Sequence, residues 1–340
     1  AGMSDRPILC KTPFPWFGGK SRVVQMVWSR FGAVDNYVEP FFGSGAVLFG
    51  RPDWRPGMTE TANDKDGYVS NFWRAVSAAP EAVAKWADWP VNENALHARH
   101  AWLVQHRGEL SRRLEGDPCF FDAKIAGWWA WGLCSWIGGR WCSGDGPWSV
   151  VDGKLAKRQL PHLGNRGQGI NRQRPHLGDR GQGINRQRPH LGDRGQWLQE
   201  WFERLQHRLR DVRICCGDWR RALGHSLTTH IGTTAVFLDP PYSAEAGREN
   251  NLYAEEDLTV AHDVCEWAIE HGQDQGLRIA LCGYDTEHDL AGWDAVTWKT
   301  NGGYANYGAG RANSAREVVW FSPGCVRPWE GRDFHMEMSA

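Results

Sequence analysis

Short apolar runs alternate with segments of helical character along most of the chain, and this alternation is what most restricts its fold. Strands that alternate with helices imply a mostly parallel sheet covered by helices on both faces. We therefore expect an α/β domain with a doubly wound, Rossmann-like sheet. The expected strands are 36–39, 212–216, 234–239, 277–282 and 317–321, with a helix at 261–270 among them.

The composition agrees with a folded chain but hides an uneven charge. The 340 residues include 21 tryptophans, which excludes a disordered chain because such chains are poor in aromatic residues. The formal net charge of −1 argues, taken alone, against a polyanionic partner. Residues 157–196, however, hold nine basic and two acidic side chains, a net of +7, so the remainder carries −8. The basic segment therefore has the charge that contact with a nucleic acid requires.

A 14-residue unit recurs within this basic segment. Residues 161–174 are repeated at 175–188 with one change, and a truncated copy occupies 189–196. Each full unit has three glycines, a proline and no apolar periodicity, which predicts turns and extended pieces. The opposing interpretation is a solvated linker that grew by duplication. His162, His176 and His190 recur with the unit, and the lack of accompanying carboxylates argues against a metal site.

The residues before and after the repeats differ in character. Helices are expected over 82–114, interrupted by Pro90, and over 197–210, where apolar residues recur at three- and four-residue spacing. The stretch 128–148 contains six tryptophans, which we expect mostly in the core. The block interrupts the strand–helix alternation, so we interpret it as an insertion in the α/β domain.

A glycine-rich turn follows the first expected strand. It reads Glu39-Pro40-Phe41-Phe42-Gly43-Ser44-Gly45 and leads into a short apolar segment that can open a helix. Such a turn lets the backbone approach a ligand closely and directs helix N–H groups at it, as in nucleotide-binding doubly wound folds. The two glycines alone are weak evidence, because an ordinary strand-to-helix turn accounts for such a pair more often than a ligand site does.

A second motif, Asp239-Pro240-Pro241-Tyr242, stands at the carboxyl end of an expected strand, where open α/β sheets place their active sites. The prolines stiffen the chain behind the acid. The Asp239 carboxylate and the Pro240 carbonyl can together accept both hydrogens of an exocyclic amine, and Tyr242 offers a face on which a planar base can stack. The motif therefore predicts a site for an aromatic amine.

These motifs together resemble the Dam-like (D12 class) DNA adenine-N6 methyltransferases of bacteria and phages, which use S-adenosylmethionine. The resemblance implies a catalytic, cofactor-binding domain of the Rossmann-like methyltransferase fold over 13–80 and 210–326. The segment 15–20 looks like the family's W-x-G-G-K motif, and 39–45 like its cofactor loop. The cofactor-contacting residues that the resemblance implies are Trp16, Gly19, Lys20, Glu39, Pro40, Phe41, Gly43, Ser44, Gly45, Asp64, Asp218, Trp219 and Asp239.

Within that set, Asp64 matches the acid that holds the cofactor's ribose, and Asp218 with Trp219 the pair that holds its adenine. The catalytic residues would be Asp239, Pro240, Pro241 and Tyr242, transferring a methyl group to N6 of an adenine flipped out of double-stranded DNA. The insertion, 81–209, departs from the better-known members and is expected to recognise the DNA target. Its candidate DNA-contacting residues are Arg140, Arg166, Arg172, Arg174, Arg180, Arg186, Arg188 and Arg194.

Other functions remain open at this point. The same motif serves cytosine N4, and RNA or a glutamine amide are further substrates, although Asp in place of Asn disfavours the amide. A non-catalytic DNA-binding module is disfavoured because the motif residues are all in place. Nine cysteines without CxxC pairs indicate reduced thiols. We expect a cytoplasmic protein without a membrane segment, metal or obligate protein partner.

Overall fold

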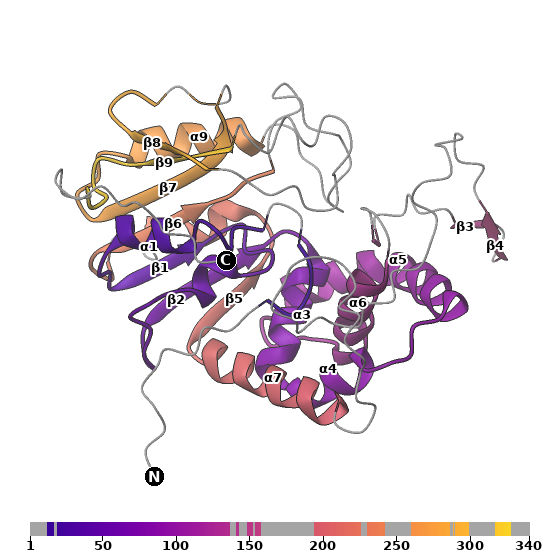
Figure 1. Ribbon diagram of the computed structural model, residues 1–340. Coiled ribbons are helices and arrows are strands. Elements are labelled where there is room, and N and C mark those ends of the chain that lie inside the picture. Colours follow the sequence, from indigo (N-terminus) through magenta and orange to yellow (C-terminus); the bar gives the residue numbers. More distant parts are fainter. Residues whose placement is uncertain are drawn as a thin grey trace, which may run out of the picture.

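A computed structural model describes the chain at residues 12–16, 19–136, 141–142, 148–151, 154–157, 194–225, 230–241, 260–285, 288, 290–298 and 317–327. Its main feature is a seven-stranded sheet with strand order β5-β2-β1-β6-β7-β9-β8 (Figure 1). The strands are β1 (Asn36–Glu39), β2 (Thr59–Asp64), β5 (Val212–Cys216), β6 (Thr234–Leu238), β7 (Leu277–Tyr284), β8 (Asp294–Thr297) and β9 (Glu317–Phe321). A separate antiparallel pair joins β3 (Trp148–Val151) to β4 (Lys154–Lys157).

The expectation of a doubly wound α/β fold is confirmed. Strands β5, β2, β1, β6 and β7 are mutually parallel, and β9 and β8 close one edge in antiparallel pairings. Strands β1, β2 and β5 follow one another toward one edge of the sheet. Strands β6 and β7 then follow one another toward the other edge. The direction therefore reverses between neighbouring strands β1 and β6, and the crevice beside their carboxyl ends is where such sheets bind ligands.

Side chains that alternate along the strands pack into two separate hydrophobic cores. On β6, Phe237 joins the larger core, whereas its neighbours Val236 and Leu238 join the smaller one. Successive strand side chains point to opposite faces, so the five-residue strand β6 contributes to both cores. This explains why β6 reads as an uninterrupted apolar run, which is typical of a strand buried on both faces.

The helices begin at residues that cap them. Asp66, Asn92 and Asp122 each accept a backbone N–H of the first turn, at 2.7 to 2.8 Å. The helices are α1 (Val24–Phe31), α2 (Ala46–Phe49), α3 (Gly67–Ala78), α4 (Pro80–Ala87), α5 (Glu93–Gly116), α6 (Ala123–Ser135), α7 (Arg194–Leu209) and α9 (Val260–His271), with a 3-10 turn η1 (Trp219–Ala222). The expected break near Pro90 separates α4 from α5.

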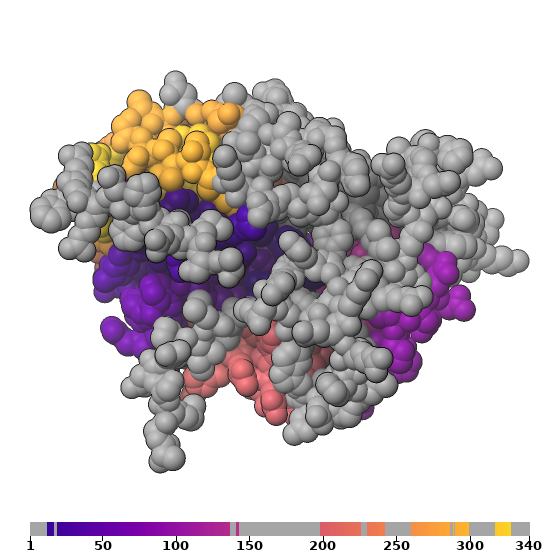
Figure 2. Space-filling model, in the orientation of Figure 1, coloured from indigo at the N-terminus to yellow at the C-terminus, as the bar shows by residue number. Residues whose placement is uncertain are grey.

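Helices α3 to α7 gather at one side of the sheet, whereas α9 lies beside β7 (Figure 1). Trp129, Trp131, Trp136 and Trp141 are buried in the larger core, as expected for most tryptophans of this region. The space-filling view shows the indigo surface of the N-terminal half next to the orange surface of the C-terminal strands and α9 (Figure 2). Within the described part of the chain, no helix has the length and apolar character needed to cross a membrane.

Candidate active site

Four acidic residues stand at the carboxyl ends of four neighbouring parallel strands. Glu39 ends β1 and Asp64 ends β2, while Asp218 and Asp239 follow β5 and β6 by one or two residues. In the order of the sheet they are Asp218, Asp64, Glu39 and Asp239. Carboxyl ends of parallel strands meet at one edge, so a sequence separation of 200 residues between Glu39 and Asp239 becomes proximity in space.

The loop from Glu39 to Gly45 depends on its glycines at two positions. Gly43 has φ +45° and Gly45 has φ +69°, both in the left-handed region that favours glycine. A Cβ atom on Gly43 would lie 2.4 Å from Nε1 of Trp16, and one on Gly45 would lie 2.7 Å from the rings of Phe42 and Phe49. The loop is therefore packed against aromatic side chains at the two positions where only hydrogen fits.

Asp64 ties this loop to the neighbouring strand end. Its Oδ2 accepts the N–H of Gly43 at 2.8 Å, and its Oδ1 accepts the N–H of Asp66 at 2.9 Å. Trp73 adds an indole N–H donated to the Gly43 carbonyl at 2.8 Å. Burial, reinforced by the Asp66 carboxylate, raises the pKa of Asp64 to about 7, although the backbone N–H bonds oppose the rise. This carboxyl group therefore titrates near neutral pH.

Glu39 is buried at the base of the same loop. Its Oε2 accepts the hydroxyl of Tyr37 at 2.8 Å. Burial raises the pKa of Glu39 well above its usual range; the Tyr37 hydrogen bond opposes this and the charge of Asp239 adds to it. Asp239, which follows the adjacent strand β6, is therefore part of the electrostatic environment of Glu39.

Asp239 is held by Lys20. The Lys20 ammonium lies 2.9 Å from Oδ1 of Asp239 and 3.9 Å from Oε2 of Glu317, at the start of β9. Lys20 is only 4% exposed, whereas the Asp239 side chain is 21% exposed. Burial on its own would lower the pKa of Lys20, but the acidic groups of Asp239, Cys282 and Glu317 outweigh it and raise that pKa above its ordinary value. An ion pair therefore fixes one oxygen of the acid in the Asp-Pro-Pro motif.

Asp218 and Trp219 open the 3-10 turn after β5. Asp218 is exposed and accepts the Arg220 N–H at 2.9 Å, and Arg220 also forms an ion pair with Asp263 at 2.6 Å. The Trp219 ring is buried beside Phe41, with ring centroids 6.2 Å apart. Its indole N–H is buried without a hydrogen-bond partner among the described residues, which marks it as a donor available to a ligand.

The structure describes some of the other predicted site residues and leaves the rest outside its described ranges. Pro40, Ser44 and Pro240 are buried and Trp16, Phe41 and Pro241 half-buried at the same edge, with Gly19 exposed nearby. Arg194 lies in the first turn of α7, without a described side chain. Tyr242, Arg140, Arg166, Arg172, Arg174, Arg180, Arg186 and Arg188 lie outside the described residues.

Sequence reasoning assigned no role to three residues that surround Lys20: Glu317, Cys282 and Trp298. Trp298 lies with its ring centroid 5.9 Å from the Lys20 ammonium. No local signal marks these residues, because they come from strands β7 and β9 and from the end of β8, and only the sheet brings them to Lys20. Among the described residues, no group of three or more His, Cys, Asp or Glu side chains is arranged to hold a metal ion.

Comparison with known proteins gives one family. Residues 16–109 match the family model of the D12 class N6 adenine-specific DNA methyltransferases. The match includes the glycine-rich loop, Lys20 and Asp64, and it ends within α5. The comparison with curated proteins yields no match.

Proposed function

We propose that the chain is an adenine-specific DNA methyltransferase, because its residues 16–109 match the D12 class family model, and we further propose its donor, acceptor and site. The donor is S-adenosylmethionine. The acceptor is the N6 amine of an adenine flipped out of duplex DNA at a specific sequence. The catalytic domain is 13–80 with 210–326, and 81–209 is the region that recognises DNA.

The order of the four acids along the sheet edge is the observation that carries the proposal. Asp218 with Trp219 is assigned to an adenine, Asp64 to a ribose, the loop from Glu39 to the methionine part, and Asp239 to the acceptor. The spatial order of these groups is the order in which S-adenosylmethionine, extended along the edge, presents adenine, ribose and methylated sulfur. Adjacent parallel strands give this order without any rearrangement.

The residues present fit this donor. The unpartnered Trp219 indole N–H and the ring of Phe41 suit a purine, which needs a polar contact and an aromatic face. A carboxylate such as Asp64 can accept both hydroxyls of a ribose diol. Gly43 has no side chain between the loop backbone and the ring of Trp16, so the loop stays closely packed at the edge where the donor would bind. When bound, the donor supplies a methyl group on a positively charged sulfur.

Two residues of the chain can make the adenine N6 amine, a weak nucleophile, more reactive. The lone pair of an arylamine nitrogen is delocalised into the ring. When the Asp239 carboxylate and the Pro240 carbonyl accept the two N6 hydrogens, they favour a pyramidal nitrogen whose lone pair points out of the ring plane. Pro240 and Pro241 restrict the backbone that carries both acceptors. This is catalysis by position and electrostatics, and it needs no cysteine nucleophile.

The decisive experiment identifies the product. DNA of mixed sequence is incubated with isotopically labelled S-adenosylmethionine, digested to nucleosides and analysed by mass spectrometry. Labelled N6-methyladenine is expected. Labelled N4-methylcytosine, or label on RNA but not on DNA, would overturn the assignment of the acceptor.

A pair of variants tests the catalytic acid. Asp239→Asn keeps the shape of the side chain but replaces an acceptor oxygen by a donor, so turnover should be lost while the protein remains folded. Glu270→Gln, which changes an exposed carboxylate on α9, is the matched control and should methylate at the wild-type rate. A folded, active Asp239→Asn variant would refute the role of Asp239.

A further inference from the structure

Glu317 lies at the active-site edge because its strand, β9, is antiparallel to β7. Parallel strands β6 and β7 present their carboxyl ends there, whereas antiparallel β9 presents its first residue. Glu317 pairs with Tyr284 at the end of β7, and Leu238, immediately before Asp239, pairs with Leu281. The reversal of one strand therefore adds a fifth acidic residue to an edge that already holds Asp218, Asp64, Glu39 and Asp239.

Lys20 lies between the two carboxylates of Asp239 and Glu317. Its ammonium is 2.9 Å from the first and 3.9 Å from the second, and it is almost fully buried. Trp298 covers one side with its ring, and its backbone N–H donates to the Glu317 carbonyl at 3.2 Å. The position of the Lys20 ammonium therefore depends on both carboxylates, because each attracts it in a different direction.

We propose that Glu317 is a positioning residue for methyl transfer: it draws Lys20 toward β9 and so fixes the direction in which Lys20 holds the carboxylate of Asp239. The inference rests on the proposed function of Asp239. It also changes the role of Lys20, which here orients the catalytic acid, whereas the family resemblance implies a contact with the donor.

Without Glu317, the attraction toward β9 is lost, and the attraction of Asp239 at 2.9 Å draws the ammonium closer to that carboxylate. An ammonium that moves over Asp239 competes with the N6 hydrogens for the same acceptor oxygens. The expected cost falls on the chemical step, because misplacement of a reacting group by about 1 Å can lower a rate by about 100-fold. Donor binding should change little, since Glu317 lies beyond β6 and β7, away from the strands assigned to the donor.

A double-mutant cycle tests this chain of contacts. Single-turnover methylation rates and equilibrium binding of S-adenosylmethionine are measured for wild type, Glu317→Gln, Lys20→Met and the double variant. Glu317→Gln should lower the rate by about 10- to 100-fold with donor affinity within about twofold of wild type. In the Lys20→Met background the same change should have no further effect, because Glu317 acts only through Lys20.

Glu317→Asp should recover part of the rate, since it restores the charge at a greater distance; it also provides the test if Glu317→Gln does not fold. Additive losses in the cycle, or a rate unchanged in folded Glu317 variants, overturn the inference. So does a Lys20→Met variant that loses donor affinity and keeps its rate, because Lys20 would then contact the donor. A wild-type protein that makes no N6-methyladenine instead refutes the proposed function itself.

Discussion

At Gly43 the loop has room for no side chain larger than a hydrogen atom. Alanine there combines an unfavourable φ of +45° with a Cβ atom 2.4 Å from Trp16 Nε1. We expect Gly43→Ala to lower the free energy of unfolding by about 1–3 kcal/mol, measured by urea denaturation, because tightly packed sites resist added atoms. Donor affinity should fall with it, since the displaced indole of Trp16 lies against the loop.

Gly57→Ala is the matched control for this change. Gly57 also has a positive φ, +85°, but a Cβ atom there would meet nothing within 4 Å. Only the backbone cost of about 1 kcal/mol should appear, with donor affinity unchanged. Equal losses in the two variants would contradict the packing argument for Gly43.

The raised pKa of Asp64 predicts a pH dependence of stability. Its pKa is about 7 in the folded protein and 3.8 ordinarily, so between these values the folded state binds more protons than the unfolded state. The free energy of unfolding that this group contributes is therefore largest below about pH 4 and is lost as pH rises toward about 7, with a slope of at most about 1.4 kcal/mol per pH unit.

The measurement is the difference between wild type and Asp64→Asn in urea denaturation from pH 4 to pH 8. The Asn variant lacks this titration, whereas other groups, such as Glu39, titrate in both proteins and cancel. The difference should fall through the window and become flat above it. A difference that stays constant from about pH 4 to about 7 would show that Asp64 is ionised throughout.

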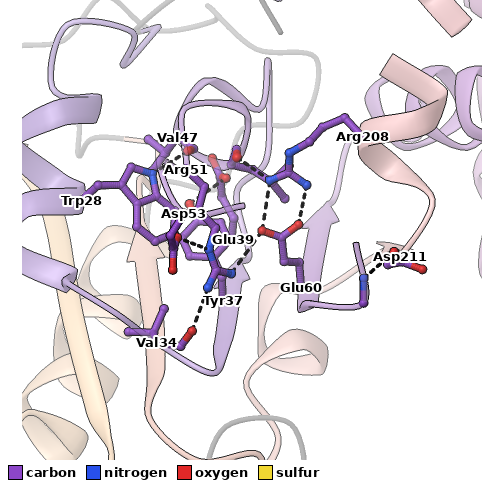
Figure 3. Close-up of polar contacts among 12 residues, drawn as sticks. Trp28, Val34, Tyr37, Glu39, Val47, Arg51, Asp53, Glu60, Arg208 and Asp211 are labelled. Carbon is purple, nitrogen blue, oxygen red and sulfur yellow. Dashed lines mark hydrogen bonds and ion pairs between the residues drawn. The ribbon is translucent and has the colours of Figure 1, made fainter. Parts of the chain in front are cut away.

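At the scale of elements, a buried ion-pair cluster attaches helix α7 to the sheet. Arg208 of α7 donates to both oxygens of Glu60 on β2, at 2.5 and 3.0 Å, and Arg51 donates to the same carboxylate at 3.3 Å (Figure 3). Arg208 also donates to the Leu48 carbonyl at 2.6 Å. All three charged side chains are nearly fully buried. Helix α7, which begins at the end of the basic repeats, is thus anchored to β2 and α2.

Arg208→Met should be strongly destabilising, by about 3–5 kcal/mol in chemical denaturation, because it leaves Glu60 buried with a weaker partner. Arg210→Met is its control: Arg210 is exposed, two residues further along, and its loss should change stability by less than about 0.5 kcal/mol. Similar effects of both changes would mean that the buried cluster contributes no more than a surface charge.

At the scale of the whole molecule, charge is divided between two parts. The segment 157–196 carries +7 and the remainder −8. A row of carboxylates suits a positively charged donor, while the basic segment suits phosphates. A long-range field of one sign near a DNA-binding surface raises the rate of encounter and makes affinity depend on salt.

Deletion of residues 175–188 tests this division. It removes three arginines and one aspartate, so the protein should bind DNA more weakly and with a shallower dependence of log affinity on log salt concentration. The methylation rate at saturating DNA should be unchanged, because the catalytic edge is intact. If the deletion changes neither the DNA affinity nor its salt dependence, the repeats are a linker and not a DNA-contacting segment.

Much of the α/β architecture was predictable because strands β6, β7 and β9, which are buried along most of their length, read as apolar runs. The ranges of β1, β5 and β9 agree with expectation, and β6 ends one residue earlier. The strand β8 was not predicted: Asp294–Thr297 is short, mostly exposed and at the sheet edge, so burial left no pattern in it. The antiparallel direction of β9 was likewise invisible, since direction depends on the connection and not on the strand's own residues.

The amino-acid sequence by itself determined the chemistry available to this protein: the glycines, the acids at strand ends and the stiff Asp-Pro-Pro turn, since each depends on local backbone geometry. Tertiary structure alone decided which acids are neighbours, that Lys20 lies against Asp239, and that Glu317 and Arg208 matter at all. The physical reason is that ion pairs and burial depend on distances across the sheet, and these distances are set by strand order and direction, which no local segment encodes.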